Sequence, residues 1–215
     1  MMRNTKITTK AATINTRIPT LLVLLLSLFV TGCGGPQLKA LDSNATILAF
    51  GDSLTAGKGV NIEHSYPTIL SQLTGLNVIN AGISGEVTEA GLRRLPPLLD
   101  QHSIDVMVLI EGGNDILRNL NLAQTQENLD QMIQSAKQRG IDVILFGVPK
   151  KSLFSDSADF YQELADKHDL IFEDELIADL LRSPQYKSDS VHFNQQGYTK
   201  LAQRVHELLK DNGAL

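Results

Sequence analysis

Five short apolar runs, separated by amphipathic stretches, constrain the fold of this 215-residue chain more than any other feature. The runs cover residues 45–50, 77–81, 105–111, 142–148 and 170–173. Each is apolar at consecutive positions, which is typical of strands buried on both faces of a sheet. The stretches between them have helical spacing over residues 65–74, 87–100, 124–139, 158–168, 175–182 and 195–210. Strands that alternate with helices favour a parallel sheet, so the sequence predicts a three-layer α/β/α sandwich with five parallel strands.

Two consecutive prolines, Pro96 and Pro97, fall inside the second of these helical stretches. A proline is tolerated in the first turn of a helix but weakens the interior, because it lacks a backbone N–H. We therefore expect this helix to be interrupted and a new helical turn to begin at Pro97.

The first 32 residues have the pattern of an export signal. Residues 1–17 contain four basic residues and no acidic one, and an apolar run from Ile18 to Val30 follows. This order is typical of a secretory signal rather than of a membrane-spanning helix. The end of the run, "VTGC" at residues 30–33, resembles the lipobox at which bacterial lipoprotein signals are cut and the cysteine is lipidated. An ordinary secretory signal with an incidental cysteine is the alternative.

Cys33 is the only cysteine of the chain, so it cannot form an intramolecular disulfide, and lipidation gives it a role. We expect a signal peptide over residues 1–32, a flexible lipidated tether over 33–44 and one domain over 45–215. The lipid would hold the protein in the bacterial cell envelope. Glycine rather than aspartate at position 34 favours the outer membrane, with the domain facing the periplasm.

The charge of the chain excludes some partners. Removal of the signal takes away four positive charges and lowers the formal net charge from −5 to −9. An acidic domain of this kind is poorly suited to nucleic acid. The sequence has no cluster with metal-ligand spacing, and "GDSLTAGKG" lacks the ending of a P-loop, so we expect neither a metal nor another cofactor. The expected protein is a monomer with a small-molecule substrate.

Three of the predicted strands end in glycine beside a small polar residue. These ends are "GDS" at 51–53, "NAGISG" at 80–85 and "GGND" at 112–115. Such clusters are also ordinary turn chemistry, so a single one would indicate nothing. The carboxyl ends of parallel strands gather along one edge of a sheet, where ligands bind. Three such ends on the same edge therefore predict a functional site.

Asp189 and His192 lie three residues apart, just before the last predicted helix. Taken alone, such a pair more often makes a surface hydrogen bond than a catalytic dyad. A serine hydroxyl, however, becomes a good nucleophile when a histidine takes its proton and a carboxylate orients that histidine. We therefore predict that Ser53 is a nucleophile, His192 its base and Asp189 the orienting acid.

Four sequence blocks resemble those of the SGNH hydrolases, also called GDSL esterases and lipases. "GDSLTAG" matches the first block, "NAGISG" the second, "GGND" the third and "DSVH" the fourth, in that order. The resemblance covers nearly all of residues 45–210 and implies a flavodoxin-like fold with a Ser53–His192–Asp189 triad. It also implies an oxyanion hole made by the backbone amides of Ser53 and Gly82 and the side-chain amide of Asn114. The chain is most similar to the periplasmic branch of thioesterases, lysophospholipases and arylesterases.

The resemblance implies hydrolysis of carboxylic ester or thioester bonds in acyl substrates. Two alternatives stay open: an enzyme that removes O-acetyl groups from a carbohydrate or the cell wall, and a lipoprotein that keeps the fold without catalysis. The four intact blocks count against the second. Phe193 stands where many members have proline, and residues 148–160 differ from the similar branch. The sequence therefore leaves the acyl-chain length and the leaving group undetermined.

Overall fold

The computed structural model describes residues 1–2, 35–150 and 157–215. Cys33 and nearly all of the predicted signal sequence therefore lie outside the described residues. The compact body extends from Pro36 to Leu215. Within the described part of the chain, no helix is long and apolar enough to cross a membrane.

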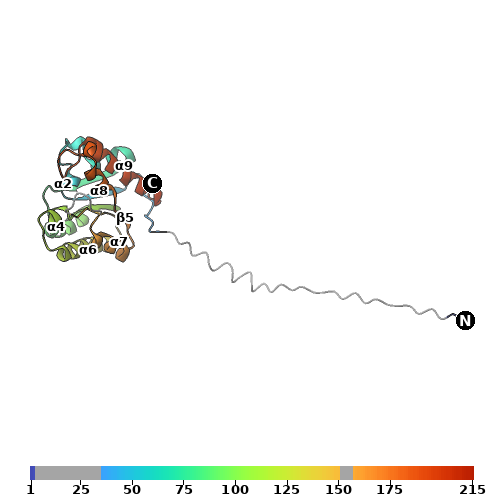
Figure 1. Ribbon diagram of the computed structural model, residues 1–215. Helices are drawn as coiled ribbons and strands as arrows, with labels where there is room; N and C mark the ends of the chain where they lie inside the picture. Colours follow the sequence, from blue (N-terminus) through green and yellow to red (C-terminus); the bar gives the residue numbers. More distant parts are fainter. Residues whose placement is uncertain (3–34, 151–156) are drawn as a thin grey trace. The chain divides into compact units, whose positions relative to one another are not determined.

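A five-stranded parallel sheet forms the centre of the body (Figure 1). Its strands are β1 (Thr46–Gly51), β2 (Asn77–Gly82), β3 (Val106–Ile110), β4 (Asp142–Phe146) and β5 (Ile171–Glu173). They lie in the order β2-β1-β3-β4-β5, so the order reverses between β1 and β3. At the carboxyl edge, Gly51 pairs with Gly82 on one side and with Ile110 on the other. Ligands of open α/β sheets bind outside this edge, next to such a reversal.

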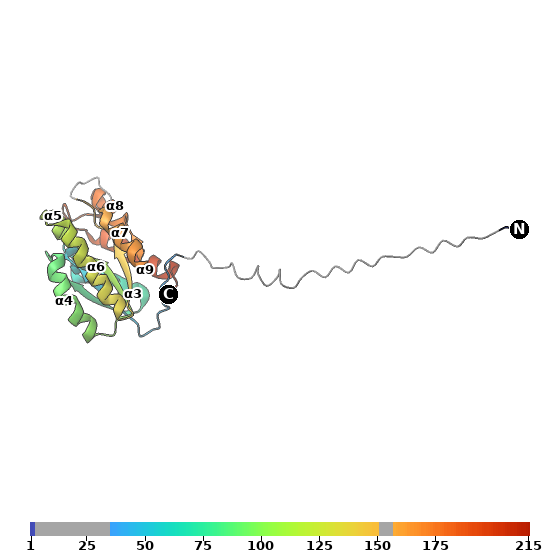
Figure 2. The ribbon, with the colours of Figure 1, turned by 90° about the horizontal axis from the view of Figure 1, so that it is seen from below.

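Helices cover both faces of the sheet. Helices α4 (Thr88–Gln101), α6 (Leu122–Gln138) and α7 (Asp159–His168) lie on one face, where Figure 2 shows α4 beside α6. Helices α3 (Tyr66–Thr74) and α9 (Gln195–Asp211) pack together on the other. Shorter helices follow the strands directly: α2 (Ser53–Ala56), α5 (Gly113–Leu117) and α8 (Leu176–Arg182). Two 3₁₀ turns, η1 (Ile62–His64) and η2 (Pro184–Tyr186), complete the described elements. The predicted three-layer sandwich with five parallel strands is confirmed.

The central strands are apolar along their whole length because helices cover them on both sides. Every residue of β3 is buried, and so is every residue of β1 except the first. Leu48, Phe50, Met107 and Leu109 have no exposed surface. The continuous runs in the sequence therefore reflect two covered faces.

Helix α4 is continuous through Pro96 and Pro97, so the expected interruption is wrong. Each proline removes a backbone donor, which weakens the helix. Leu95 and Leu99 are both buried in the core, at 0% and 5% exposure. Tertiary packing of an amphipathic face supplies most of the stability of a helix in a protein. Burial of these leucines against the sheet therefore holds the helix together on both sides of the prolines.

The segment predicted to be a flexible tether is hydrogen-bonded to the body from Leu38 onward. Leu38 N–H donates to Asn212 O at 3.0 Å, and Leu41 N–H donates to Ala214 O at 2.9 Å. Between them, Lys39 N–H donates to an Asp142 carboxylate oxygen at 2.8 Å. The sequence of this segment has no regular pattern, so its pairing with the end of the chain could not be predicted. The body begins at Pro36 rather than at residue 45.

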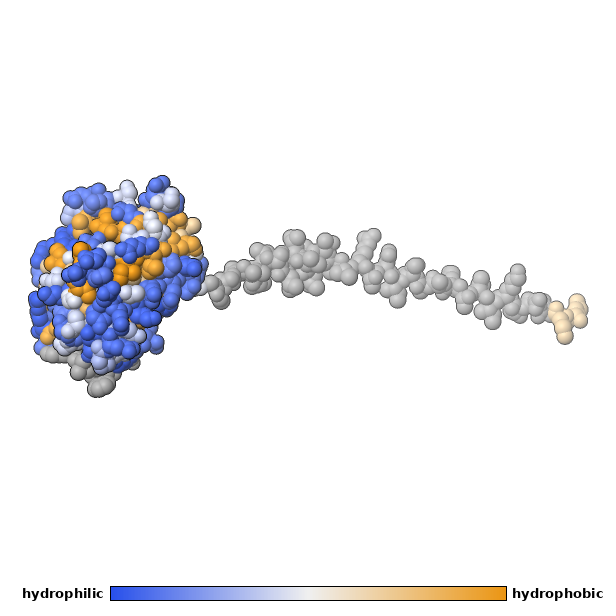
Figure 3. All heavy atoms as spheres, turned by 90° about the horizontal axis from the view of Figure 1, so that it is seen from above, coloured by the Kyte–Doolittle hydropathy of each residue, from blue (hydrophilic) through white to orange (hydrophobic). Residues whose placement is uncertain are grey.

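Hydrophilic residues cover most of the face shown in Figure 3, with hydrophobic residues gathered in patches among them. Within the described body, the exposed large hydrophobic side chains are Ile62, Leu73, Ile83, Leu117, Leu120, Leu122 and Leu215. Leu117 lies on α5, Leu120 in the turn after it and Leu122 at the start of α6, close in sequence to the carboxyl end of β3. This end of the sheet therefore carries apolar surface.

Candidate active site

The turn after β1 places Ser53 at the start of α2. An added Cβ at Gly51 would lie 2.0 Å from Ile110 O, so the close approach of β1 and β3 at this point requires glycine. Asp52 caps α2, because its carboxylate accepts from Leu54 N–H at 3.0 Å. As the first residue of the helix, Ser53 has a backbone N–H without an intrahelical acceptor. Both the hydroxyl and this N–H are available to a ligand.

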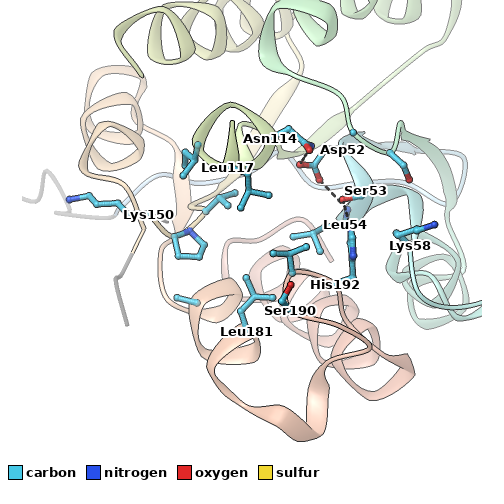
Figure 4. Close-up of a pocket in the computed structure, with 18 residues that line it drawn as sticks. Asp52, Ser53, Leu54, Lys58, Asn114, Leu117, Lys150, Leu181, Ser190 and His192 are labelled. Carbon is cyan, nitrogen blue, oxygen red and sulfur yellow. Dashed lines mark hydrogen bonds between the residues drawn. The ribbon is translucent and has the colours of Figure 1, made fainter. Parts of the chain in front are cut away.

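Ser53, His192 and Asp189 form a chain of contacts at the carboxyl edge of the sheet. Ser53 Oγ lies 3.1 Å from His192 Nε2, a contact that Figure 4 marks with a dashed line. His192 Nδ1 lies 2.7 Å from Asp189 Oδ2. Asp189 Oδ1 accepts from Val191 N–H and from His192 N–H, both at 2.9 Å. The structure therefore brings together the three residues that the sequence singled out.

The hydrogen bond from Val191 N–H is the main cause that lowers the pKa of Asp189 below its ordinary value. Partial burial opposes this effect, and the contacts with His192 reinforce it. The carboxylate therefore remains ionised over a wide pH range. An ionised carboxylate beside Nδ1 favours the tautomer in which Nε2 is free to take a proton from Ser53 Oγ.

Packing holds the loop that carries His192. Phe193, the next residue, has no exposed surface, and its ring meets that of Tyr198 edge-on with centroids 5.5 Å apart. Ser188 N–H donates to His192 O at 3.0 Å, which closes the loop. A buried aromatic side chain thus fixes this loop.

Asn114 lies on α5, directly after β3, and borders the same pocket as Ser53 and His192. Its side-chain Nδ2 donates to Asp52 Oδ2 at 3.0 Å, the second dashed line in Figure 4. An amide nitrogen has two N–H groups, so one remains for a ligand. Asp52 thereby connects the turn after β1 to the turn after β3.

Gly82 does not join this group. Its backbone N–H donates to Asn80 Oδ1 at 3.0 Å, and it is not among the residues that line the pocket. Gly85, the second glycine of "NAGISG", does line the pocket. Within the described part of the chain, no residue accepts a hydrogen bond from Gly85 N–H. The motif contains both glycines, and its spacing alone could not indicate which one faces the site.

An ion pair holds the loop that carries Gly85. Arg94 Nε lies 2.8 Å from both carboxylate oxygens of Glu86, whose side chain is 4% exposed. Arg94 Nη2 also donates to Ala81 O at 2.8 Å, and the guanidinium lies 3.9 Å from the centroid of Phe50. Sequence reasoning missed this pair, because its partners lie eight residues apart on a loop and a helix.

Two buried acids lie behind the site. Burial raises the pKa of Asp52 to about 6, against the lowering effects of Leu54 N–H, His192 and Asn114. Glu111, which ends the third apolar run, has no exposed surface, and neither of its carboxylate oxygens has a hydrogen-bond partner among the described residues. Burial and the nearby charge of Asp52 raise the pKa of Glu111 well above its ordinary value. Burial therefore favours the protonated, neutral form of Glu111.

An apolar pocket of about 410 Å³ opens beside Ser53 and His192. Its hydrophobic lining comes from five parts of the chain: Leu54, Ile116, Leu117, Val148, Pro149, Ala178, Leu181 and Val191. Figure 4 shows Ser53 and His192 on one side of this space and Lys150 on the other, with Leu117 and Leu181 facing each other across it. The pocket has the size and lining of a small-molecule site. Among the described residues, no cluster of His, Cys, Asp or Glu could hold a metal ion.

The comparisons with known proteins concern the family of the chain. Residues 49–200 match the model of the GDSL-like Lipase/Acylhydrolase family. The chain is 32% identical over 201 residues to the arylesterase of Vibrio mimicus, covering 88% of this chain and 99% of that protein. It is 30% identical over 168 residues to "Thioesterase 1/protease 1/lysophospholipase L1" of Escherichia coli strain K12, covering 73% and 79%.

Two further similarities are to a solved structure and to a lipoprotein. The esterase EstA of Pseudoalteromonas sp. superposes with a TM-score of 0.70 at 22% identity, covering 78% of this chain and 98% of that one. An uncharacterized lipoprotein of Bacillus subtilis strain 168, YqeF, is 32% identical over 143 residues, covering 58% and 54%. The first is a likeness of fold alone. With its family blocks in order and its family model matched over most of its length, this chain belongs to the GDSL-like lipase/acylhydrolase family, the SGNH hydrolases, and is a serine ester hydrolase.

Proposed function

We propose that the protein hydrolyses carboxylic esters or thioesters of acyl chains, with Ser53, His192 and Asp189 as its catalytic triad. The observation that carries this proposal is the continuous contact from Ser53 Oγ through His192 to the Asp189 carboxylate, at one side of an apolar pocket. An activated serine beside a pocket for an apolar chain fits an acyl substrate.

In the proposed reaction, His192 Nε2 takes the proton of Ser53 Oγ as that oxygen attacks the acyl carbonyl carbon. The tetrahedral intermediate collapses, the bond to the alcohol or thiol breaks, and the leaving group receives the proton from His192. Water then attacks the acyl-enzyme with His192 again as base, which releases the acid and restores Ser53. Asp189 holds the imidazole ring and stabilises its charged form throughout.

The oxyanion would be stabilised by Ser53 N–H, Asn114 Nδ2 and a backbone amide of the loop after β2. Gly85 is better placed for this third donation than Gly82, because Gly85 lines the pocket and the N–H of Gly82 is already bonded to Asn80. We therefore assign the third donor to Gly85 N–H. Removal of one such donor typically costs about 3 to 4 kcal/mol of transition-state binding.

The apolar pocket favours acyl chains longer than acetyl over the O-acetylesterase alternative. Each methylene that leaves water contributes about 0.8 kcal/mol, or about fourfold in kcat/KM when it is fully buried. The test uses p-nitrophenyl esters of graded chain length, assayed below their critical micelle concentrations. We expect kcat/KM to rise from acetyl toward medium chains and then level off when the pocket is full. A strict preference for acetyl would contradict the acyl-chain proposal.

We also propose that a lipid on Cys33 anchors the protein to the outer membrane, with the body facing the periplasm. The lipobox and the similarity to a lipoprotein support this proposal. Wild-type protein should fractionate with membranes. Cys33→Ser should block lipidation, whereas an ordinary secretory signal fused ahead of Pro36 should give a periplasmic enzyme that is active without membranes. Wild-type protein found free in the periplasm, with an unmodified Cys33, would contradict the anchor and leave the catalytic proposal intact.

A further inference from the structure

A second, polar hollow adjoins the apolar pocket. The two share Lys58 and Ser84 in their linings, so they meet beside Ser53. The side chains that line the polar hollow include Asn61, His64, Asn194 and Gln195. An ester has two halves, and the apolar pocket suits only the acyl half. The polar hollow lies where the other half of the substrate, the leaving group, would lie.

Lys58 lies on the opposite side of Ser53 and His192 from the apolar side chains. Figure 4 shows Lys58 on one side of this pair, with Leu117, Leu181 and Lys150 on the other. His192 must give a proton to the leaving group, so that group has to lie next to Nε2. An acyl chain that occupies the apolar pocket would therefore direct the leaving group toward Lys58.

The backbone of Lys58 is held in place while its side chain is free. Lys58 N–H donates to Ser53 O at 3.0 Å, and the buried Tyr198 donates its hydroxyl to Lys58 O at 2.7 Å. Among the described residues, none forms a hydrogen bond or an ion pair with Lys58 Nζ. The main chain of Lys58 is thus bonded to that of Ser53, and its ammonium group remains available to a ligand.

The charge of the polar hollow differs from that of the whole chain. The chain has a formal net charge of −5, yet the described lining of the hollow contains Lys58 and His64 and no carboxylate. A local positive charge attracts an anion to a protein that would otherwise repel it. We propose, on the basis of the proposed hydrolase function, that the polar hollow binds the leaving group and that Lys58 selects a leaving alcohol or thiol that carries a negative charge.

The test compares two esters that share one acyl chain. One is a p-nitrophenyl ester, and the other carries a carboxylate on the same ring, next to the nitro group. For each protein the measurement is the ratio of kcat/KM for the charged ester to that for the neutral ester. Lys58→Met should lower this ratio about fivefold through KM, as expected for one solvent-exposed charge pair, and Lys58→Arg should restore it. The wild-type ratio should also fall as salt is raised to about 1 M.

Lys210→Met is the matched control, because it changes the net charge equally at the far end of α9 and is exposed. Its ratio should equal that of the wild type. A ratio that Lys58→Met leaves unchanged, while both esters are still hydrolysed, would overturn the inference and leave the hydrolase proposal intact. Equal falls in Lys58→Met and Lys210→Met would overturn it too, since the effect would then come from the overall charge. Failure of the wild type to hydrolyse either ester would remove the hydrolase proposal and this inference with it.

Discussion

The side-chain amide of Asn114 has two proposed roles, one as a hydrogen-bond donor within the protein and one as a donor in the reaction. Its Nδ2 donates to Asp52 in the resting structure, and its second N–H remains for the proposed contact with the oxyanion. Asn114→Ala should lower kcat about a hundredfold or more and leave KM nearly unchanged, because the lost contact forms mainly in the transition state. Steady-state kinetics with a p-nitrophenyl ester check this, with circular dichroism as a control for folding. A loss confined to KM would make Asn114 a substrate-binding residue instead.

The three residues of the proposed triad were predictable one by one, but the glycine of the proposed oxyanion hole was not. Ser53, Asp189 and His192 stand in blocks where each chemical role has a single candidate. The segment "NAGISG" offers two glycines, and only the direction of their N–H groups separates them. That direction depends on the side chain of Asn80, which accepts from Gly82. Hydrogen bonds of this kind do not produce a repeating pattern in the sequence from which they could be predicted.

At the scale of elements, one buried carboxylate connects helices α4, α5 and α6. Asp115 on α5 accepts from Thr88 N–H at 2.9 Å and from Thr88 Oγ1 at 2.7 Å, at the start of α4. It also accepts from Thr125 Oγ1 on α6 at 3.2 Å. Asp115 is 3% exposed, so water cannot take the place of its carboxylate as the acceptor for these donors. The carboxylate therefore fixes the helix that follows β3 relative to two longer helices.

Asp115→Ala should lower the free energy of unfolding by about 2 to 4 kcal/mol, because it leaves the two buried donors of Thr88 on α4 without this acceptor. Thr125→Val removes the longest of the hydrogen bonds to Asp115, together with the one from Thr125 Oγ1 to Asn121 O, and should cost about 1 kcal/mol. Urea denaturation of both variants measures the difference. If Asp115→Ala were no less stable than Thr125→Val, the connection between the three helices would be of little importance.

The long elements were predictable from the sequence, and the short ones that shape the site were not. The expected helix over 195–210 is found as α9, Gln195–Asp211, because its apolar residues recur at helical spacing. Helix α5, with five residues, is too short to show a period and was missed. The continuity of α4 was missed as well, since the burial of Leu95 and Leu99 that overrides its prolines is a tertiary effect.

At the scale of the whole molecule, the buried Asp52 makes stability depend on pH. Burial raises its pKa from 3.8 to about 6 in the folded protein. Between these values the folded state binds more protons than the unfolded state, so the free energy of unfolding falls as the pH rises through this window. The side chain of the Asp52→Asn variant cannot ionise, so its free energy of unfolding does not fall in this way. Its free energy of unfolding should rise relative to that of the wild type by about 2 kcal/mol from pH 4 to pH 7.

Urea denaturation of both proteins at several pH values measures this difference. The same experiment also detects the loss of one hydrogen bond, because the Asn side chain keeps a single acceptor oxygen where Asp52 accepts from both Leu54 N–H and Asn114 Nδ2. This loss shifts the variant at every pH. A difference that does not change between pH 4 and pH 7 would mean that burial does not perturb Asp52 as the fold indicates.

The central claim is that His192 and Asp189 make Ser53 a nucleophile. A fluorophosphonate reacts irreversibly with an activated serine, and mass spectrometry locates the adduct. The measurement is the rate and position of labelling in the wild type, Ser53→Ala and His192→Ala. For the wild type we expect one adduct per chain, on the peptide that contains Ser53, and for Ser53→Ala we expect none. Labelling of the folded His192→Ala variant should be at least a hundredfold slower than that of the wild type. An unlabelled wild type, an adduct on another residue, or equal labelling rates with and without His192 would contradict the central claim.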